Sequence, residues 1–158
     1  MPGVGKSYWA EQIAAAYAMQ CIDLDNIIEV RTGMSIGSFF ERYGEAEFRK
    51  LEQVTLRQVI EVFGKNCVVA CGGGTPCFYD NLAQMKSKGT IVYLEASIST
   101  ICAQLAQEHQ KRPLLQLADW QDKLASMLQQ RAPIFEQADC ILATKDLTIA
   151  DFKSILSA

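Results

Sequence analysis

The sequence has 158 residues, of which 49% are hydrophobic, and a formal net charge of −3 at pH 7. This length and composition predict one domain with a substantial core, and the acidic balance argues against a general nucleic-acid-binding surface. No apolar run approaches the roughly 18 residues of a membrane span, and the N-terminal residues lack the basic and apolar regions of a signal peptide, so we expect a cytoplasmic protein with no membrane association.

The chain begins with most of a phosphate-binding loop. Gly5, Lys6 and Ser7 fill the last three places of the pattern GxxxxGK[ST], and residues 1–4 fill its variable places. In such loops backbone N–H groups surround phosphate oxygens, the lysine reaches the β- and γ-phosphates, and the hydroxyl ligates Mg²⁺. The run SYWAEQIAAAYAM then continues as a helix, as the motif requires. The residues expected to bind the nucleotide here are Gly3, Val4, Gly5, Lys6, Ser7 and Tyr8.

Helical and extended segments alternate along the rest of the chain. The expected helices cover residues 7–18, 26–31, 45–63, 80–87, 97–107, 119–131 and 149–156, and Ser35 caps a further one. The expected strands cover residues 20–24, 67–71, 90–94 and 139–143. This alternation predicts an α/β protein with a mainly parallel sheet.

The strand that normally precedes a phosphate-binding loop is missing, because no residues precede the loop to form it. Such a central strand buries about four or five aliphatic side chains, each worth roughly 1.5–3 kcal/mol. The total is comparable with the net stability of a whole domain, roughly 5–15 kcal/mol. We therefore expect a truncated sequence, for instance through a misplaced start, in preference to a marginally stable protein.

Two acidic residues, Asp23 and Asp25, lie at the end of the expected strand 20–24 with one residue between them. Residues two apart on an extended strand point to the same face, and the carboxyl end of a parallel strand opens on the ligand crevice. A solvated acidic turn is the alternative. The neighbouring phosphate-binding loop favours a functional pair.

Six cysteines are scattered without a CxxC pair or nearby histidine ligands: Cys21, Cys67, Cys71, Cys77, Cys102 and Cys140. We expect reduced thiols in place of a metal or redox site. The single histidine, His109, has no evident partner and is expected to be solvated.

Five motifs in this order closely resemble those of the shikimate kinases. They are the phosphate-binding loop, IDLDNIIE (22–29), SIGSFFERYGEAEFRKLE (35–52), GGG (72–74), and the pair RPLL (112–115) and RAPIF (131–135). The resemblance implies a P-loop NTPase-like, three-layer α/β/α fold with strand order 2-3-1-4-5, the first strand being absent. It also implies a monomer that uses ATP and Mg²⁺ to convert shikimate to shikimate 3-phosphate in chorismate and aromatic amino-acid biosynthesis.

The same resemblance implies roles for individual residues. Lys6, Asp25 and Arg112 would be catalytic, with Asp25 contacting the substrate hydroxyls and accepting a proton, and Arg112 also contacting the nucleotide. Ser7 and Asp23 would hold Mg²⁺. One domain would span residues 1–158, with a substrate-binding helical segment at about 25–52 and a lid at about 108–116 that carries Arg112.

Shikimate is a small carboxylate with three hydroxyls, so its site should combine arginine forks with polar groups. The substrate-binding residues implied by the resemblance are Asp25, Arg49, Gly72, Gly73, Gly74 and Arg131. Glu52 lies three residues beyond Arg49 and could orient its guanidinium. Phe40 and Phe48 would wall the pocket, although Phe48 fits better as a core residue.

The chain departs from the family before the lid, where ICAQLAQEHQ lacks the usual arginine and leaves Gln104 near the expected adenine. Two alternatives remain. One is another small-molecule P-loop kinase, such as a gluconate kinase, which the combined motifs argue against. The other is a binding remnant without catalysis, which the missing strand would permit.

Overall fold

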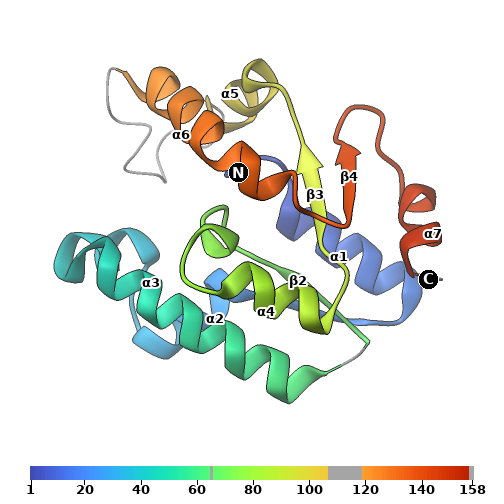
Figure 1. The fold of residues 1–158 in the computed structure, drawn as a ribbon, viewed down its shortest axis with the longest axis horizontal. Helices are drawn as coiled ribbons and strands as arrows, with labels where there is room; N and C mark the ends of the chain where they lie inside the picture. The colour runs from blue at the N-terminus through green and yellow to red at the C-terminus, as the bar shows by residue number, and fades with distance from the viewer. Residues whose placement is uncertain (65, 107–118, 157–158) are drawn as a thin grey trace.

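Helices and short parallel strands alternate along the chain (Figure 1). The computed structural model describes residues 1–64, 66–106 and 119–156. The strands are β1 (Gln20–Asp23), β2 (Cys67–Ala70), β3 (Val92–Glu95) and β4 (Cys140–Ala143). The helices are α1 (Lys6–Tyr17), α2 (Leu24–Thr32), α3 (Ile36–Phe63), α4 (Asn81–Lys88), α5 (Ile98–Ala106), α6 (Trp120–Phe135) and α7 (Lys153–Leu156), with 3₁₀ turns η1 (Thr75–Cys77) and η4 (Ile149–Phe152).

The strands form two parallel pairs. β1 runs beside β2, with Ile22 opposite Val69, and β3 runs beside β4, with Leu94 opposite Leu142. A largely apolar groove of about 720 Å³ is lined by β2, β3 and α1. In the expected order 2-3-1-4-5, strand 1 lies between strands 3 and 4. Without strand 1 the order divides into two pairs, 2-3 and 4-5, which correspond to the observed pairs β1-β2 and β3-β4. The predicted α/β fold with parallel strands is therefore observed.

The segment after β1 differs from the sequence-based expectation. Helix α2 starts directly after Asp23, whose carboxylate accepts a hydrogen bond from the Asn26 N–H at 3.2 Å and so caps the helix. Ser35 caps α3 as predicted, since its hydroxyl oxygen accepts a hydrogen bond from the Ser38 N–H. The two helices expected in this region form one element, α3, with a break at Gly44 (φ 80°, ψ 170°). That break separates the same two stretches that the sequence predicted.

The C-terminal elements also differ in their ends. Helix α6 continues four residues past the expected end at residue 131, with Pro133 inside its last turn. The expected helix 149–156 begins as the 3₁₀ turn η4, where Thr148 and Asp151 form a capping box, and only then becomes α7. None of the described helices is both long and apolar enough to span a lipid bilayer.

Two clusters of buried apolar side chains stabilise the two halves of the fold seen in Figure 1. One joins the phosphate-binding loop to β3, α5 and α6; its most deeply buried members are Ile101, Leu105 and Leu124. The other is formed mainly by side chains of α2 and α3, and its most deeply buried members are Leu24, Ile28, Phe48 and Leu56. Burying one such side chain contributes roughly 1.5–3 kcal/mol. The packing therefore holds the ends of β1 and β2 beside the phosphate-binding loop.

Candidate active site

The phosphate-binding loop precedes α1 and exposes backbone N–H groups at the N-terminus of that helix. Gly5 adopts the left-handed conformation (φ 79°) directly before the helix, where a residue with a side chain would be strained. Lys6 Nζ donates a hydrogen bond to the Met1 carbonyl at 2.5 Å, across the loop. Val4 is only 3% exposed and packs in the core, so its backbone alone could contact a nucleotide. The geometry suits a bound anion.

A cavity of about 430 Å³ lies beside this loop and brings together most of the residues expected to bind nucleotide and metal. Its lining includes Gly3, Gly5, Lys6, Ser7, Tyr8, Asp23, Asp25, Cys71, Gly73 and Gln104. Gln104 thus lines the same cavity as the phosphate-binding loop. Burial raises the pKa of the Cys71 thiol to about 12, so the thiolate is absent at neutral pH and Cys71 is not a nucleophile.

Ser7 and Asp23 form the pair expected to hold a metal. The Ser7 hydroxyl donates to Asp23 Oδ2 at 2.6 Å, while Asp23 Oδ1 caps α2. Hydroxyl and carboxylate oxygens are ligands that suit Mg²⁺, which usually keeps several waters and binds substrate phosphates. Across the described ranges no cluster of three or more His, Cys, Asp or Glu side chains could hold a metal. The hydroxyl and carboxylate of this pair suit a Mg²⁺ ion, for which nucleotide and water would supply the other ligands.

Asp25 lies in the first turn of α2, so the expectation that it shares an extended strand with Asp23 was wrong. The cap formed by Asp23 starts the helix early, and the first helical turn still places both carboxylates on the same cavity. Burial, followed by the charges of Asp23 and Glu52, raises the pKa of Asp25 to about 6 against the opposing effect of Lys6. A carboxylate with this pKa can accept a proton near neutral pH.

Arg49 lies in α3, next to the three-glycine turn (residues 72–74), and only 8% of its surface is exposed. Its Nη1 donates to Glu52 Oε2 at 2.8 Å, while Nε and Nη2 donate to Glu45 Oε1 at 3.1 and 2.9 Å. The predicted contact between Glu52 and Arg49 is thus present. A Cβ built on Gly74 would lie 2.6 Å from Arg49 Nη2, so only glycine permits this close approach.

Three phenylalanine rings lie close to the Arg49 guanidinium. Two of them, Phe40 and Phe48, are the aromatic residues that were expected near the pocket, and both also pack in the core. The Arg49 guanidinium carbon lies 5.8 Å from the ring centroid of Phe40, 5.2 Å from that of Phe48 and 4.4 Å from that of Phe78. Phe48 is 2% exposed and belongs to the core, as predicted.

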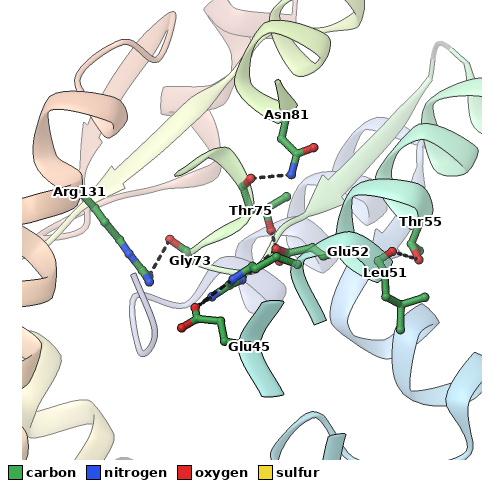
Figure 2. Close-up of polar contacts among 9 residues, drawn as sticks. Glu45, Leu51, Glu52, Thr55, Gly73, Thr75, Asn81 and Arg131 are labelled. Atoms are coloured by element: carbon green, nitrogen blue, oxygen red, sulfur yellow. Dashed lines mark hydrogen bonds and ion pairs between the residues drawn. The ribbon is translucent and has the colours of Figure 1, made fainter. Parts of the chain in front are cut away.

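Arg131 approaches the same turn from helix α6. Its Nη1 donates to the Gly73 carbonyl at 3.3 Å, and Figure 2 shows it reaching the turn from the side opposite Glu52 and Thr75. Burial lowers the pKa of Arg131, although a guanidinium remains protonated at neutral pH. Two arginines from distant parts of the chain therefore meet at one turn. Arg112, His109 and the expected lid at 108–116 lie outside the described residues.

Of the buried polar residues behind this turn, sequence reasoning identified Glu52 but not Thr75 or Asn81 (Figure 2). The Thr75 hydroxyl donates to Glu52 Oε1 at 2.6 Å, and Asn81 Nδ2 donates to the Thr75 carbonyl at 2.9 Å. Glu52, Thr75 and Asn81 are all 0% exposed. Only the spacing of Glu45, four residues before Arg49, could have been noticed in the sequence as an ion pair.

Replacing Thr75 by valine should weaken binding of the acceptor substrate, because it keeps the side-chain shape but leaves a buried Glu52 oxygen without its donor. We expect a loss of about 1–3 kcal/mol in stability and a higher KM for the acceptor with a smaller change in kcat. Thr55→Val is a matched control: Thr55 is 1% exposed on the same helix as Glu52, and its hydroxyl donates to the Leu51 carbonyl at 2.8 Å. Steady-state kinetics and thermal unfolding of both variants check the prediction. Equal KM values for the two variants would contradict it.

A phosphate-binding loop, a nearby pair of acids and two arginines at the adjoining three-glycine turn are the features of a P-loop phosphotransferase with a small anionic acceptor. The family model described as "Shikimate kinase" matches residues 2–158. The chain belongs to the shikimate kinase family.

Known shikimate kinases agree with this assignment over most of the chain. The enzyme of Thermodesulfovibrio yellowstonii is 34% identical over 146 residues, which cover 92% of this chain and 83% of that protein. The enzyme of Paracidovorax citrulli is 37% identical over 138 residues, or 87% of this chain and 75% of that protein.

Solved structures extend the similarity to the fold. Shikimate kinase from Bacteroides thetaiotaomicron matches with a TM-score of 0.91 and 32% identity, covering 99% of this chain and 94% of that chain. Shikimate kinase from Acinetobacter baumannii, solved in complex with shikimate, matches with a TM-score of 0.88 and 30% identity, covering 98% and 88%. The predicted family, fold class and ATP-dependent phosphorylation of shikimate are confirmed, and the alternatives of a gluconate kinase or a binding remnant are not favoured.

Proposed function

We propose that the cavity beside the phosphate-binding loop is where this chain transfers the γ-phosphoryl group of ATP to shikimate, with ATP on the Gln104 side and shikimate beyond the three-glycine turn. The observation that carries this proposal is that Lys6, Ser7 and Asp25 line one cavity while Arg49 and Arg131 converge on the turn that borders it. Phosphoryl transfer depends mainly on such positioning and on charge neutralisation.

On the nucleotide side, backbone N–H groups of the loop would bind the phosphates and Lys6 would stabilise the charge that develops on the γ-phosphoryl oxygens. Ser7 and Asp23 would hold Mg²⁺, which would supply positive charge against the phosphate oxygens of the nucleotide. The 2.6 Å contact between the two side chains supports this pairing. The lid at 108–116 with Arg112 stays a prediction from the sequence.

On the acceptor side, Asp25 would orient the attacking hydroxyl and accept its proton. Its raised pKa, about 6, supports this role because such a carboxylate is ionised at neutral pH yet more basic than an ordinary aspartate. Arg49, Arg131 and the backbone N–H groups of residues 72–74 would bind the substrate carboxylate and neighbouring hydroxyls.

We also propose that residues 1–158 act as one domain, in a cytoplasmic monomer whose partners are ATP and shikimate and include neither nucleic acid nor membrane. Helix α1 supports the single domain, because it packs against β1 and β2 and also against η4 at the other end of the chain. Residues 25–52 contain α2 and the part of α3 that carries Arg49, which supports their role as the substrate-binding segment.

The direct test is turnover by the purified chain with ATP and Mg²⁺, followed through ADP release and through formation of phosphorylated shikimate. We expect shikimate-dependent turnover that disappears when Mg²⁺ is chelated and that gluconate does not replace. Binding of both ATP and shikimate without turnover would instead support the alternative of a binding remnant.

Arg131→Lys should weaken the interaction with shikimate, since a point charge replaces a planar fork. Loss of one hydrogen bond to a charged group, roughly 1.5–3 kcal/mol, corresponds to an increase of about 10- to 150-fold in KM for shikimate. The KM for ATP should change less, because the described contact of Arg131 is with the three-glycine turn and not with the phosphate-binding loop. A lysine variant with the wild-type KM for shikimate would remove Arg131 from the substrate site.

A further inference from the structure

The contacts of Arg49 point to a residue that competes with the substrate. We propose that Glu45 occupies the edge of the Arg49 guanidinium that the shikimate carboxylate needs, so that Glu45 must turn away before the carboxylate can bind. Glu45 would then lower the affinity for shikimate and restrict the site to ligands with a carboxylate. This inference rests on the proposed role of Arg49 in substrate binding.

Two of the three edges of this guanidinium are covered by residues that cannot move easily. Nη1 donates to Glu52 Oε2 at 2.8 Å, and Glu52 is fully buried and also bound by the Thr75 hydroxyl. The tip of the guanidinium faces Gly74, where a Cβ would lie 2.6 Å from Nη2 and 2.7 Å from Nη1. A ligand therefore has little room at either edge.

The faces of the guanidinium are also covered. The ring centroid of Phe78 lies 4.4 Å from the guanidinium carbon, and that of Phe48 lies 5.2 Å from it. The remaining edge carries Nε and Nη2, which both donate to Glu45 Oε1, at 3.1 and 2.9 Å. This edge is the one that offers two parallel N–H groups to a carboxylate.

Unlike Glu52, the Glu45 side chain can move away from the Arg49 guanidinium. The Glu45 side chain is 54% exposed, whereas the Glu52 side chain is 0% exposed. Glu45 also directly follows the break in α3 at Gly44, where even an added Cβ would meet no atom within 4 Å. Its carboxylate can therefore turn into solvent without disturbing packed neighbours.

Electrostatics makes this displacement necessary. Arg49 already contacts two carboxylates, so one cation is shared between two anions. A substrate carboxylate would add a third negative charge within a few ångströms, and like charges in a poorly solvated site repel strongly. When Glu45 turns away, the two oxygens of the substrate carboxylate can each accept a hydrogen bond from Nε and Nη2, which both donate to a single oxygen of Glu45. An uncharged ligand cannot make this exchange, because it would leave a buried guanidinium with weaker acceptors.

The test compares Glu45→Gln with Glu47→Gln in the full chain. Glu47 lies on the same helix, is 55% exposed, and pairs with Lys50 at 2.7 Å, so its replacement changes the net charge equally without touching Arg49. Calorimetric titration with shikimate should give a Kd about 2- to 5-fold lower for Glu45→Gln, as expected for removal of a partly exposed ion pair, and an unchanged Kd for Glu47→Gln. The carboxamide analogue of shikimate should also bind more tightly to Glu45→Gln than to the wild type, because the carboxylate that excludes it from this edge of Arg49 is gone.

Weaker binding by Glu45→Gln would show that Glu45 positions Arg49, and an unchanged Kd would show that it does not compete; either result overturns the inference. Arg49→Lys, titrated alongside, separates this failure from failure of the proposed site. If Arg49→Lys weakens shikimate binding and Glu45→Gln does not strengthen it, only the competition is wrong. If Arg49→Lys leaves the Kd unchanged, Arg49 is not part of the substrate site. Thermal unfolding of every variant verifies that each remains folded.

Discussion

Replacing Lys6 by alanine should lower kcat by about 10²- to 10³-fold while the Kd for shikimate stays the same. The ammonium group stabilises charge that spreads over the γ-phosphoryl oxygens during transfer, and removing one such preorganised group has an effect of this size. Lys6 lies on the phosphate-binding loop and donates a hydrogen bond to the Met1 carbonyl, whereas the described hydrogen bonds of Arg49 and Arg131 go to Glu45, Glu52 and Gly73. Steady-state kinetics and calorimetric titration with shikimate measure the two quantities.

Lys50→Ala is the matched control for this variant. Lys50 is a surface lysine on α3 whose side chain is 62% exposed and pairs only with exposed Glu47 in the described contacts. We expect its kcat and both KM values to equal those of the wild type. If Lys6→Ala weakened shikimate binding as much as it lowered kcat, the proposed division between a phosphate side and an acceptor side would be wrong.

The second large effect is expected for Asp25→Asn, which should lower kcat by about 10²- to 10⁴-fold through loss of a general base. In the wild type, kcat/KM for shikimate should fall about tenfold per pH unit below about pH 6, because protonation of Asp25 removes the proton acceptor. Asp122→Asn, at an exposed position of α6, should leave the pH profile unchanged. An Asp25→Asn enzyme with wild-type kcat would exclude Asp25 as the base.

The same substitution should stabilise the fold at neutral pH. Since the pKa of Asp25 is higher in the folded protein, about 6, than its ordinary value of 3.8, ionisation opposes folding. This penalty is absent below about pH 4 and is complete above about pH 6, where it amounts to about 1–3 kcal/mol. Asp25→Asn should therefore raise Tm at pH 7.5 and not at pH 3.5. A Tm that rises equally at both values would show that the substitution acts through packing.

Local patterns were sufficient to predict the elements of this fold and one side of its site. The GKS motif placed Lys6 and Ser7 at the start of α1, because the conformation of such a loop depends on its own glycines and on the helix that follows. Each expected strand is present, since continuous apolar runs between polar turns have few other ways to be buried. The end of β1 was predicted less well, because the cap formed by Asp23 competes with extension of the strand.

By itself the sequence determined the family, the order of helices and strands and the residues expected to contact phosphate, since these depend on chemistry between near neighbours in the chain. Only the tertiary structure decided which residues surround the three-glycine turn, where we propose that the acceptor binds. It brought Arg131 to the carbonyl of Gly73 and the Thr75 hydroxyl to Glu52. Arg131 and Gly73 are separated by 58 positions, and no local pattern encodes such a contact. It follows from the packing of α6 and α3 around the turn, which buries their apolar faces and carries the polar side chains into place.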